Sequence, residues 1–226
     1  MRVVLSLGGS MVMQDFNADR IKAYASVIEK LASKHTILVV VGGGRVARNY
    51  ISTARSLGAD ETFCDYLGIG VTRLNAMLLA SAIKQAPKVV PEDFRQAYEL
   101  SLSHSVVVMG GTFPGHTTDA TAALLAEFVN ADVLLNATSV DGVYSADPRK
   151  DPNAVRYDRI TAKELVRIVS VGETKAGSSN VIDLLAAKVI ERSGIRTVIF
   201  LGEPENIEKA LKGDVEGIGT VVEVDQ

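Results

Sequence analysis

Residues 105–119, with the sequence SVVVMGGTFPGHTTD, decide the fold class of this 226-residue chain. The apolar run at their start predicts a buried strand, and residues 120–128 that follow predict a helix. The loop between them is rich in glycines, hydroxyl groups and backbone N–H groups. A strand that runs through such a loop into a helix N-terminus often builds an anion site, because free N–H groups and the positive end of the helix dipole favour phosphate.

Short apolar runs alternate with helical patterns along the rest of the chain. Strands are predicted at residues 3–7, 36–41, 88–90, 106–109, 133–136, 197–201 and 219–224. Helices are predicted at residues 21–32, 46–57, 63–83 (interrupted near Gly68 and Gly70) and 181–192, and onward from Pro91, Thr161 and Pro204. This alternation predicts an α/β fold, a three-layer α/β/α sandwich with a mostly parallel central sheet.

Local signals mark where several of these helices begin and end. Asn17 is a predicted N-cap, and Thr161 with Glu164 forms a capping box. Gly58 and Gly194 are predicted to end their helices. Residues 141–153 are polar and predict a loop.

Composition and net charge restrict the kinds of partner and the compartment that suit this chain. The net charge of −3 and a pI of about 5.7 predict no nucleic-acid partner. The lone Cys64 cannot form an intrachain disulfide and suits a reducing compartment. No apolar run approaches the ~18 residues of a membrane span, and the N-terminal residues have the pattern of a first strand. We therefore expect a single domain in the cytoplasm, without membrane contact.

Glycine-rich segments follow three predicted strands, and ligands of parallel sheets bind beyond the carboxyl ends of the strands. Gly8-Gly9-Ser10 suits either a phosphate or a tight turn. Gly42-Gly43-Gly44 precedes Arg45 and Arg48 in the first turn of a helix. Because the helix dipole disfavours cations there, Arg48 suggests that an anion offsets the mismatch, and both arginines could lean toward it.

Hydroxyl and carboxylate groups cluster at the end of residues 105–119. Thr117, Thr118 and Asp119 could bind phosphate, ribose or a base edge, and Thr118 or Asp119 could instead simply cap the helix. His116 is more typical of a loop histidine than of a general base. Phosphoryl transfer needs no catalytic histidine, since it depends on positioning and charge neutralisation.

Other candidate residues lie further along the chain. Tyr144 could border an adenine and Asp147 could accept from a ribose hydroxyl, although residues 137–148 also suit a polar hairpin. Asp65 is an acid inside an apolar helical stretch. Lys175 could neutralise phosphate charge or be an ordinary surface lysine.

The order of these segments along the chain is similar to that of a known family. Neither a Walker A motif nor G-x-G-x-x-G is present. Instead, the chain has Gly42–Gly44 with Arg48, then Asp65, then residues 111–119, then VDGVYSADP at residues 140–148. In this order they resemble the amino acid kinase superfamily along essentially the whole chain, and within it the uridylate kinase family in its archaeal form.

This resemblance implies transfer of the γ-phosphate of ATP to UMP, a step of pyrimidine nucleotide biosynthesis. Residues 1–135 would form the acceptor lobe and residues 136–226 the ATP lobe. The implied ATP-binding residues are Gly9, Ser10, Gly44, Arg48, Thr138, Tyr144 and Asp147. The implied UMP-binding residues are Gly43, Asp65, Thr112, Phe113, Pro114, Gly115, His116, Thr117 and Thr118. The predicted catalytic residues are Arg48, Asp119 and Lys175.

The resemblance further implies Mg²⁺ carried on the ATP phosphates, without a dedicated protein metal site. It also implies a homohexamer built as a trimer of dimers, with an interface that includes part of the helix before Gly58. Many members carry lysines where this chain has Ser6 and Ser139. We therefore expect Arg48, Lys175 and Mg²⁺ to neutralise the transferring phosphate.

Two alternatives remain open at this point. One is another kinase of the superfamily, acting on a carboxylate, a carbamate or an isoprenyl phosphate. Arg48 together with Asp65 favours a phosphorylated ribose acceptor over these. The other is a non-catalytic nucleotide-binding or oxyanion-binding protein, such as a molybdate or tungstate storage subunit, for which the two absent lysines leave room.

Overall fold

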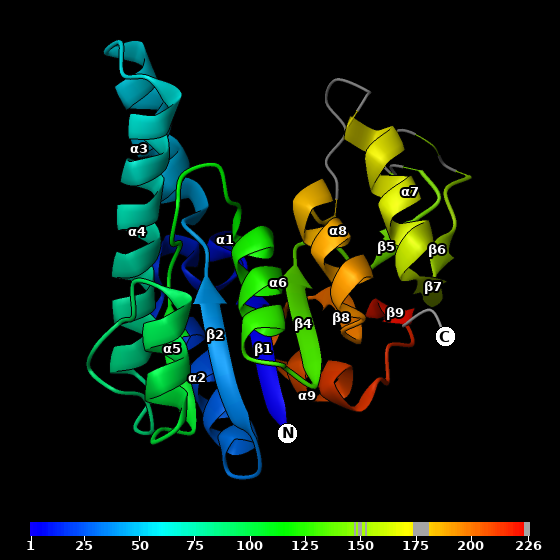
Figure 1. Ribbon diagram of the computed structural model, residues 1–226, viewed down its shortest axis with the longest axis horizontal. Helices are drawn as coiled ribbons and strands as arrows, with labels where there is room; N and C mark the ends of the chain where they lie inside the picture. Colours follow the sequence, from blue (N-terminus) through cyan, green and yellow to red (C-terminus); the bar gives the residue numbers. More distant parts are fainter. Residues whose placement is uncertain (147, 149–150, 152, 174–180, 224–226) are drawn as a thin grey trace.

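The computed structural model describes residues 1–146, 148, 151, 153–173 and 181–223 (Figure 1). A mostly parallel sheet with the strand order β3-β2-β1-β4-β8-β9-β7 forms its centre. Only the pair β8–β9 runs antiparallel within this sheet as described. Its strands are β1 (Arg2–Leu7), β2 (Thr36–Val41), β3 (Val106–Met109), β4 (Val133–Thr138), β7 (Arg159–Thr161), β8 (Thr197–Leu201) and β9 (Gly219–Glu223). The predicted α/β class with a mostly parallel sheet is confirmed.

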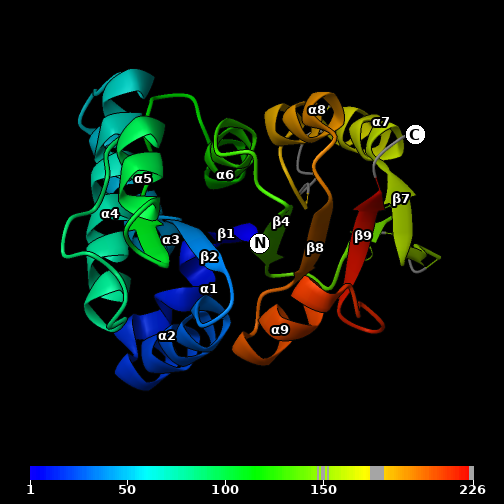
Figure 2. The same ribbon diagram turned by 60° about the horizontal axis from the view of Figure 1, so that its bottom comes forward.

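Helices cover both faces of the sheet. In Figure 2, α6, α7 and α8 lie over one face, α2 and α9 over the other, and α3, α4 and α5 lie at the end of the sheet that carries β3. The helices are α1 (Gly9–Val12), α2 (Ala18–Ala32), α3 (Gly44–Ser56), α4 (Glu61–Ser81), α5 (Phe94–Ser101), α6 (Thr118–Phe128), α7 (Ala162–Glu173), α8 (Leu184–Ser193) and α9 (Pro204–Lys212). A 3₁₀ turn, Gln14–Phe16, and a small antiparallel pair of β5 (Val143–Tyr144) with β6 (Arg156–Tyr157) complete the described elements.

Successive side chains of β1 point to opposite faces of the sheet, and the hydrophobic core has one layer on each face. Val3, Leu5 and Leu7 belong to the layer that includes residues of α2 and α9. Val4 belongs to the layer on the other face, which includes residues of α6 and α8. Ser6 is directed to this second face by the same alternation, so it faces α6 at the carboxyl end of the strand.

Several local predictions are confirmed. The Asn17 side chain accepts hydrogen bonds from the N–H groups at the start of α2. Thr161 and Glu164 form the reciprocal hydrogen bonds of a capping box. Gly194 ends α8 in the left-handed conformation, and Pro204 is the first residue of α9.

Other local predictions are wrong. Residues 88–90 form no strand, and Val89 is exposed, because this short apolar run has no partner strand. The helix α4 continues through Gly68 and Gly70, since Gly68 packs closely against Ile51 of α3. The short helix α1 was not predicted, α8 begins at Leu184, and β5 lies inside a segment predicted as a loop.

The loops after β1 and β2 touch backbone to backbone. A Cβ atom on Gly9 would lie 2.2 Å from the carbonyl oxygen of Gly42 and 2.5 Å from the nitrogen of Gly44. Gly44 has φ +62°, and a Cβ atom there would lie 2.7 Å from the carbonyl carbon of Gly9. We call Gly9, Gly42 and Gly44 the glycine seam. Because β1 and β2 are adjacent parallel strands, side chains at these positions would force the two loops apart.

Neighbouring glycines in the first loop are expected to respond differently to substitution. We predict that Gly9→Ala lowers the free energy of unfolding by about 2 kcal/mol or more, because the added methyl group overlaps backbone that cannot move independently. Gly8→Ala is the matched control, since its Cβ atom would meet nothing closer than 3.7 Å. Chemical denaturation measures both variants, and equal stabilities would contradict the seam.

Candidate active site

Three loops at the carboxyl edge of the sheet meet around the glycine seam. A Cβ atom on Gly42 would lie 2.8 Å from the nitrogen of Gly9 and 2.9 Å from Oγ1 of Thr118. The segments after β1, β2 and β3 therefore converge at one place, although they are far apart in the sequence. This is the edge where parallel sheets bind ligands.

Asp119, in the first turn of α6, lies beside this junction. Ser6 Oγ on β1 donates a hydrogen bond of 3.2 Å to Asp119 Oδ1. Burial, and to a lesser extent the nearby charge of Asp183, raise the pKa of Asp119 to about 7, although favourable contacts with Ser6 and Asn136 lower it in part. Both polar side-chain atoms of Asn136 are buried and lack a hydrogen bond of good geometry within the described structure. The site thus holds a carboxyl group that is only partly ionised near neutral pH.

Asp183 is a site residue that the sequence analysis missed. It is the N-cap of α8, where one carboxylate oxygen accepts from Ala186 N at 2.9 Å. The other oxygen accepts a short hydrogen bond from the Thr117 hydroxyl. An aspartate before the apolar pattern of residues 184–190 is an N-cap signal, but the predicted helix began too early to reveal it.

Thr117 caps helix α6 and also lies at the candidate site. Its hydroxyl accepts from Ala120 N at 3.0 Å, so Thr117 is the N-cap of α6. The alternative prediction that Thr118 or Asp119 caps this helix is therefore wrong. Because Thr117 fixes the cap, Thr118 and Asp119 lie in the first turn, beside the glycine seam and Ser6.

Side chains of α4 hold the loop of residues 110–117. Thr72 Oγ1 accepts from Gly111 N at 2.7 Å, and Arg73 Nε donates to Gly111 O at 3.3 Å. Asp65 Oδ2 accepts from Gly115 N at 2.7 Å, where the backbone of Gly115 has φ +81°. The structure therefore brings Asp65 directly against the predicted acceptor loop, and it adds Thr72 and Arg73, which the sequence analysis missed.

The remaining residues of this loop surround its outer turn. Phe113 is 63% exposed, and its ring lies 6.2 Å from the ring of His116. Thr112, Pro114 and His116 are half-buried, and Nδ1 of His116 is buried without a hydrogen-bond partner among the described residues. The loop that Asp65 holds thus presents an exposed aromatic ring.

The basic side chains are arranged differently from the prediction that both arginines lean toward one ligand. Arg45 is exposed and pairs with Asp15 at 2.6 Å. Arg48 is exposed and forms no ion pair or hydrogen bond within the described parts of the chain. Ser10 is also exposed, at the start of α1. Lys175 lies outside the described residues.

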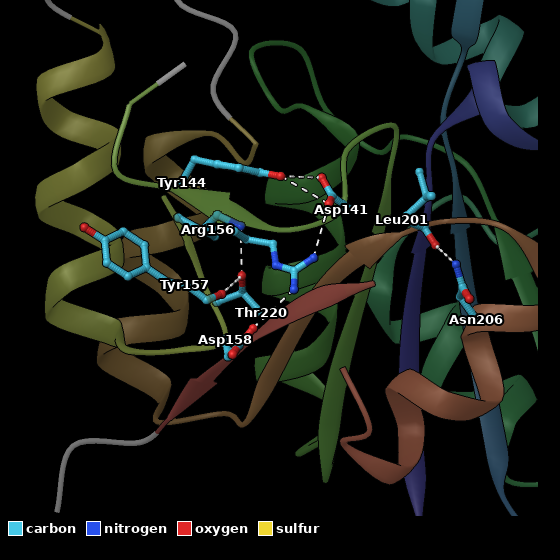
Figure 3. A network of polar contacts seen from close by, with 9 residues as sticks. Asp141, Tyr144, Arg156, Tyr157, Asp158, Leu201, Asn206 and Thr220 are labelled. Atoms are coloured by element: carbon cyan, nitrogen blue, oxygen red, sulfur yellow. Dashed lines mark hydrogen bonds and ion pairs between the residues drawn. The ribbon is translucent and has the colours of Figure 1, made fainter. Parts of the chain in front are cut away.

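The segment after β4 forms a fixed polar network (Figure 3). The Tyr144 hydroxyl donates to both carboxylate oxygens of Asp141, at 3.0 and 3.1 Å, and Arg156 Nη1 lies 3.2 Å from the same carboxylate. Burial and the neighbouring Asp141 raise the pKa of Tyr144. Thr220 Oγ1 accepts from Val143 N at 2.8 Å, which ties β5 to β9.

This network holds the ring of Tyr144 in one orientation near the end of β4. Thr138 is the last residue of β4, and its carbonyl accepts from Gly202 N at 2.8 Å. Asp147 lies outside the described residues. The predicted polar hairpin and the predicted nucleotide contact are compatible, since the hairpin itself fixes Tyr144.

The chemistry of the site is that of a phosphate-binding α/β protein. Within the described chain, no group of three or more His, Cys, Asp or Glu side chains could hold a metal ion. Asp119 and Asp183 nonetheless supply hard oxygen donors that fit Mg²⁺, provided that phosphate oxygens and waters complete its coordination. No helix among the described residues is long and apolar enough to cross a membrane.

Comparison with known proteins defines the family. The model of the amino acid kinase family matches residues 1–201, so the chain belongs to that family. It is 62% identical to the uridylate kinase of Archaeoglobus fulgidus over 222 residues, covering 98% of this chain and 100% of the relative. It is 48% identical to the uridylate kinase of Methanocaldococcus jannaschii over 227 residues, covering 99% and 100%.

Solved structures agree with this assignment. The crystal structure of uridylate kinase from Archaeoglobus fulgidus has a TM-score of 0.91 to this chain at 61% identity, covering 98% of this chain and 100% of that one. The crystal structure of UMP kinase from Ureaplasma parvum has a TM-score of 0.81 at 25% identity, covering 99% and 98%. The similarity therefore extends over the whole fold.

The raised pKa of Asp119 predicts a pH-dependent cost in stability. The native carboxyl binds its proton more tightly than the unfolded one, so stability falls as pH rises from about 4 through 7. We expect Asp119→Asn to remove this cost. Relative to wild type, the Mg²⁺-free variant should gain about 2–3 kcal/mol more at pH 8 than at pH 5 in urea denaturation.

The control is Asp19→Asn, which alters a carboxylate whose side chain is 90% exposed. This variant should show no comparable gain between the two pH values. An Asp119→Asn variant whose stability relative to wild type is the same at pH 5 and pH 8 would show that Asp119 is not held in this state.

Proposed function

We propose that this protein transfers the γ-phosphoryl group of ATP to UMP, forming ADP and UDP in pyrimidine nucleotide synthesis. One arrangement carries the proposal: the glycine seam adjoins the start of α6, which carries Asp119, and Asp65 holds the loop that leads into that helix. The identity of 62% to a uridylate kinase over essentially the whole chain supports the same conclusion. Both nucleotides and a reduced Cys64 suit the cytoplasm, where we place the reaction.

The acceptor would bind on the side of α4. Asp65 uses Oδ2 to hold Gly115 N, which leaves Oδ1 to accept from a ribose hydroxyl of UMP. Gly43 would approach the UMP phosphate through its backbone, and residues 112–118 would enclose the uracil. The exposed ring of Phe113 supports this assignment, because aromatic rings can pack against a base.

The donor would bind across the end of β4. Gly9, Ser10 and Gly44 would contact the ATP phosphates, and Thr138 with Tyr144 would border the adenosine, together with Asp147. The fixed orientation of Tyr144 supports this role, since a ring that is already held loses little entropy on binding.

In the reaction, an oxygen of the UMP phosphate attacks the γ-phosphorus and the bond to the β-γ bridging oxygen breaks, releasing ADP. The attacking oxygen is already deprotonated, so no general base is required, and positioning with charge neutralisation supplies the catalysis. Ser6 donates to Asp119, so it does not replace the cation of related kinases. Mg²⁺ would supply Lewis-acid charge on the ATP phosphates, with Asp119 and Asp183 as its protein donors.

An ADP-release assay separates this function from its alternatives. With UMP, CMP, dUMP, acetylglutamate, carbamate and isopentenyl phosphate as acceptors, we expect turnover with UMP alone. Turnover with another acceptor and none with UMP would assign a different kinase activity. Stoichiometric molybdenum or tungsten in the purified protein, with no turnover, would instead favour the storage alternative.

Arg48, which is exposed, and Lys175 are the proposed sources of positive charge. Arg48→Ala and Lys175→Ala should each lower kcat by roughly 10²-fold, as does removing a group that stabilises transition-state charge. Arg45→Ala is the matched control, because Arg45 is paired with Asp15 and should leave kcat nearly unchanged. If neither test variant lost turnover, the proposed charge neutralisation would be wrong.

A homohexamer built as a trimer of dimers is also part of the proposal. Large apolar side chains are exposed near both ends of α4: Phe63 and Tyr66 near its start, and Leu74, Met77 and Leu78 near its end. Exposed apolar side chains gathered on one helix are typical of protein interfaces. It supports assembly through the α3–α4 side of the molecule, including the end of α3 before Gly58.

Charged substitutions on this face test the assembly. Leu74→Glu combined with Met77→Glu should lower the particle mass measured by light scattering, because two charges would be buried in an apolar contact. Leu102→Glu alters a similarly exposed leucine at the end of α5 and should leave the mass unchanged. An unchanged mass in the double variant would exclude α4 from the interface.

A further inference from the structure

Asn75 is a buried polar residue of α4 to which neither the sequence analysis nor the proposed reaction gives a role. Only 3% of it is exposed. Its Nδ2 donates to the carbonyl oxygen of Gly42 at 2.9 Å and to that of Gly43 at 3.3 Å. A buried amide that donates to two successive carbonyls fixes the planes of two successive peptide groups.

The planarity of the peptide bond then determines where the N–H groups point. In a trans peptide the N–H lies opposite the preceding C=O, and the described chain has no cis peptide bond. With the Gly42 and Gly43 carbonyls directed at Asn75, the N–H groups of Gly43 and Gly44 point away from it. Neither N–H has an acceptor among the described residues. Two aligned, unpaired donors therefore remain available at the start of α3.

These donors lie at the junction of the loops. The nitrogen of Gly44 is the atom that a Cβ on Gly9 would approach to 2.5 Å, so it lies on the glycine seam. Three consecutive glycines have many accessible backbone conformations, and the strand and helix on either side fix only their ends. Asn75 is the described side chain whose hydrogen bonds select one of these conformations.

We infer that Asn75 is a positioning residue that turns the Gly43 and Gly44 N–H groups toward the phosphates of the two substrates. This inference rests on the proposed phosphoryl transfer. Without the Asn75 amide, Gly43 O would keep its hydrogen bond from Ala47 N, whereas Gly42 O would lose its described donor. The Gly42–Gly43 peptide could then rotate, and its N–H would no longer be held toward the phosphate.

Two substitutions at Asn75 and one control test this role. Asn75→Ala removes the donor, and Asn75→Asp keeps the size but places an acceptor against two carbonyl oxygens. Asn206→Ala is the matched control, because Asn206 is also buried and its Nδ2 donates to Leu201 O at 3.0 Å, as Figure 3 shows. All are assayed at a temperature where denaturation curves show that each variant is folded.

Both Asn75 variants should lower kcat roughly 10-fold or more and raise the KM for UMP, as expected when backbone donors to a transferring group are lost. Asn206→Ala should keep both constants close to wild type. Losses of kcat in Asn75→Ala that are no larger than those in Asn206→Ala would overturn the inference while leaving the kinase function intact.

A structural readout keeps the inference independent of the activity. In crystal structures of the variants, the Gly42–Gly43 peptide should be rotated or split between orientations in Asn75→Ala and unchanged in Asn206→Ala. If the wild type transferred no phosphate to UMP, the proposed function would fail, and this comparison would still decide the role of Asn75. A peptide that keeps its orientation in Asn75→Ala would overturn that role.

Discussion

The direct contact between two backbones at the glycine seam is the constraint on which the site depends. Adjacent parallel strands β1 and β2 deliver their loops to the same place, and the carbonyl of Gly42 and the nitrogen of Gly44 occupy the space where a side chain of Gly9 would lie. The absence of side chains leaves backbone N–H groups as the chemical surface. Such a surface suits phosphate, because its donors are fixed and require no reorganisation when the ligand binds.

Around the seam, the acidic side chains and Arg48 form no ion pairs with one another within the described chain. Asp119 and Asp183 lie near each other, and the pKa of Asp119 is raised to about 7, while Arg48 is exposed and unpaired among the described residues. Ionising Asp119 costs stability in the free protein, and under the proposed function bound Mg²⁺ would offset this cost while Arg48 would pair with a nucleotide phosphate. Ser6 donates a hydrogen bond to Asp119 but carries no charge. Because Ser6 and Ser139 stand where many family members carry lysines, other groups must supply the positive charge beside the phosphates.

Helix α4 connects this chemistry with the proposed assembly. One side of the helix contacts both ligand loops through Asp65, Thr72, Arg73 and Asn75. The opposite side exposes Leu74 and Met77. The same helix therefore helps to position both loops, and it runs uninterrupted through Gly68, which packs closely against Ile51 of α3.

Features that depend on neighbouring residues could be predicted from the sequence. The apolar strands, the glycine loops and caps such as Asn17 depend on local pattern, and they were predicted correctly. Residues 88–90 were mispredicted because an apolar run becomes a strand only beside a partner. Asp183 and Asn75 were missed because their importance depends on which elements meet, and the sequence offers only a cap signal for the first and a polar residue in an apolar helix for the second.

A crystal structure of the protein with UMP and a non-hydrolysable ATP analogue tests the central claim most directly. The glycine seam predicts the UMP phosphate within hydrogen-bonding distance of the Gly43 nitrogen, the ATP phosphates at Gly9 and Gly44, and a ribose hydroxyl of UMP on the Asp65 carboxylate. Nucleotide phosphates bound away from the Gly43 and Gly44 nitrogens would contradict it.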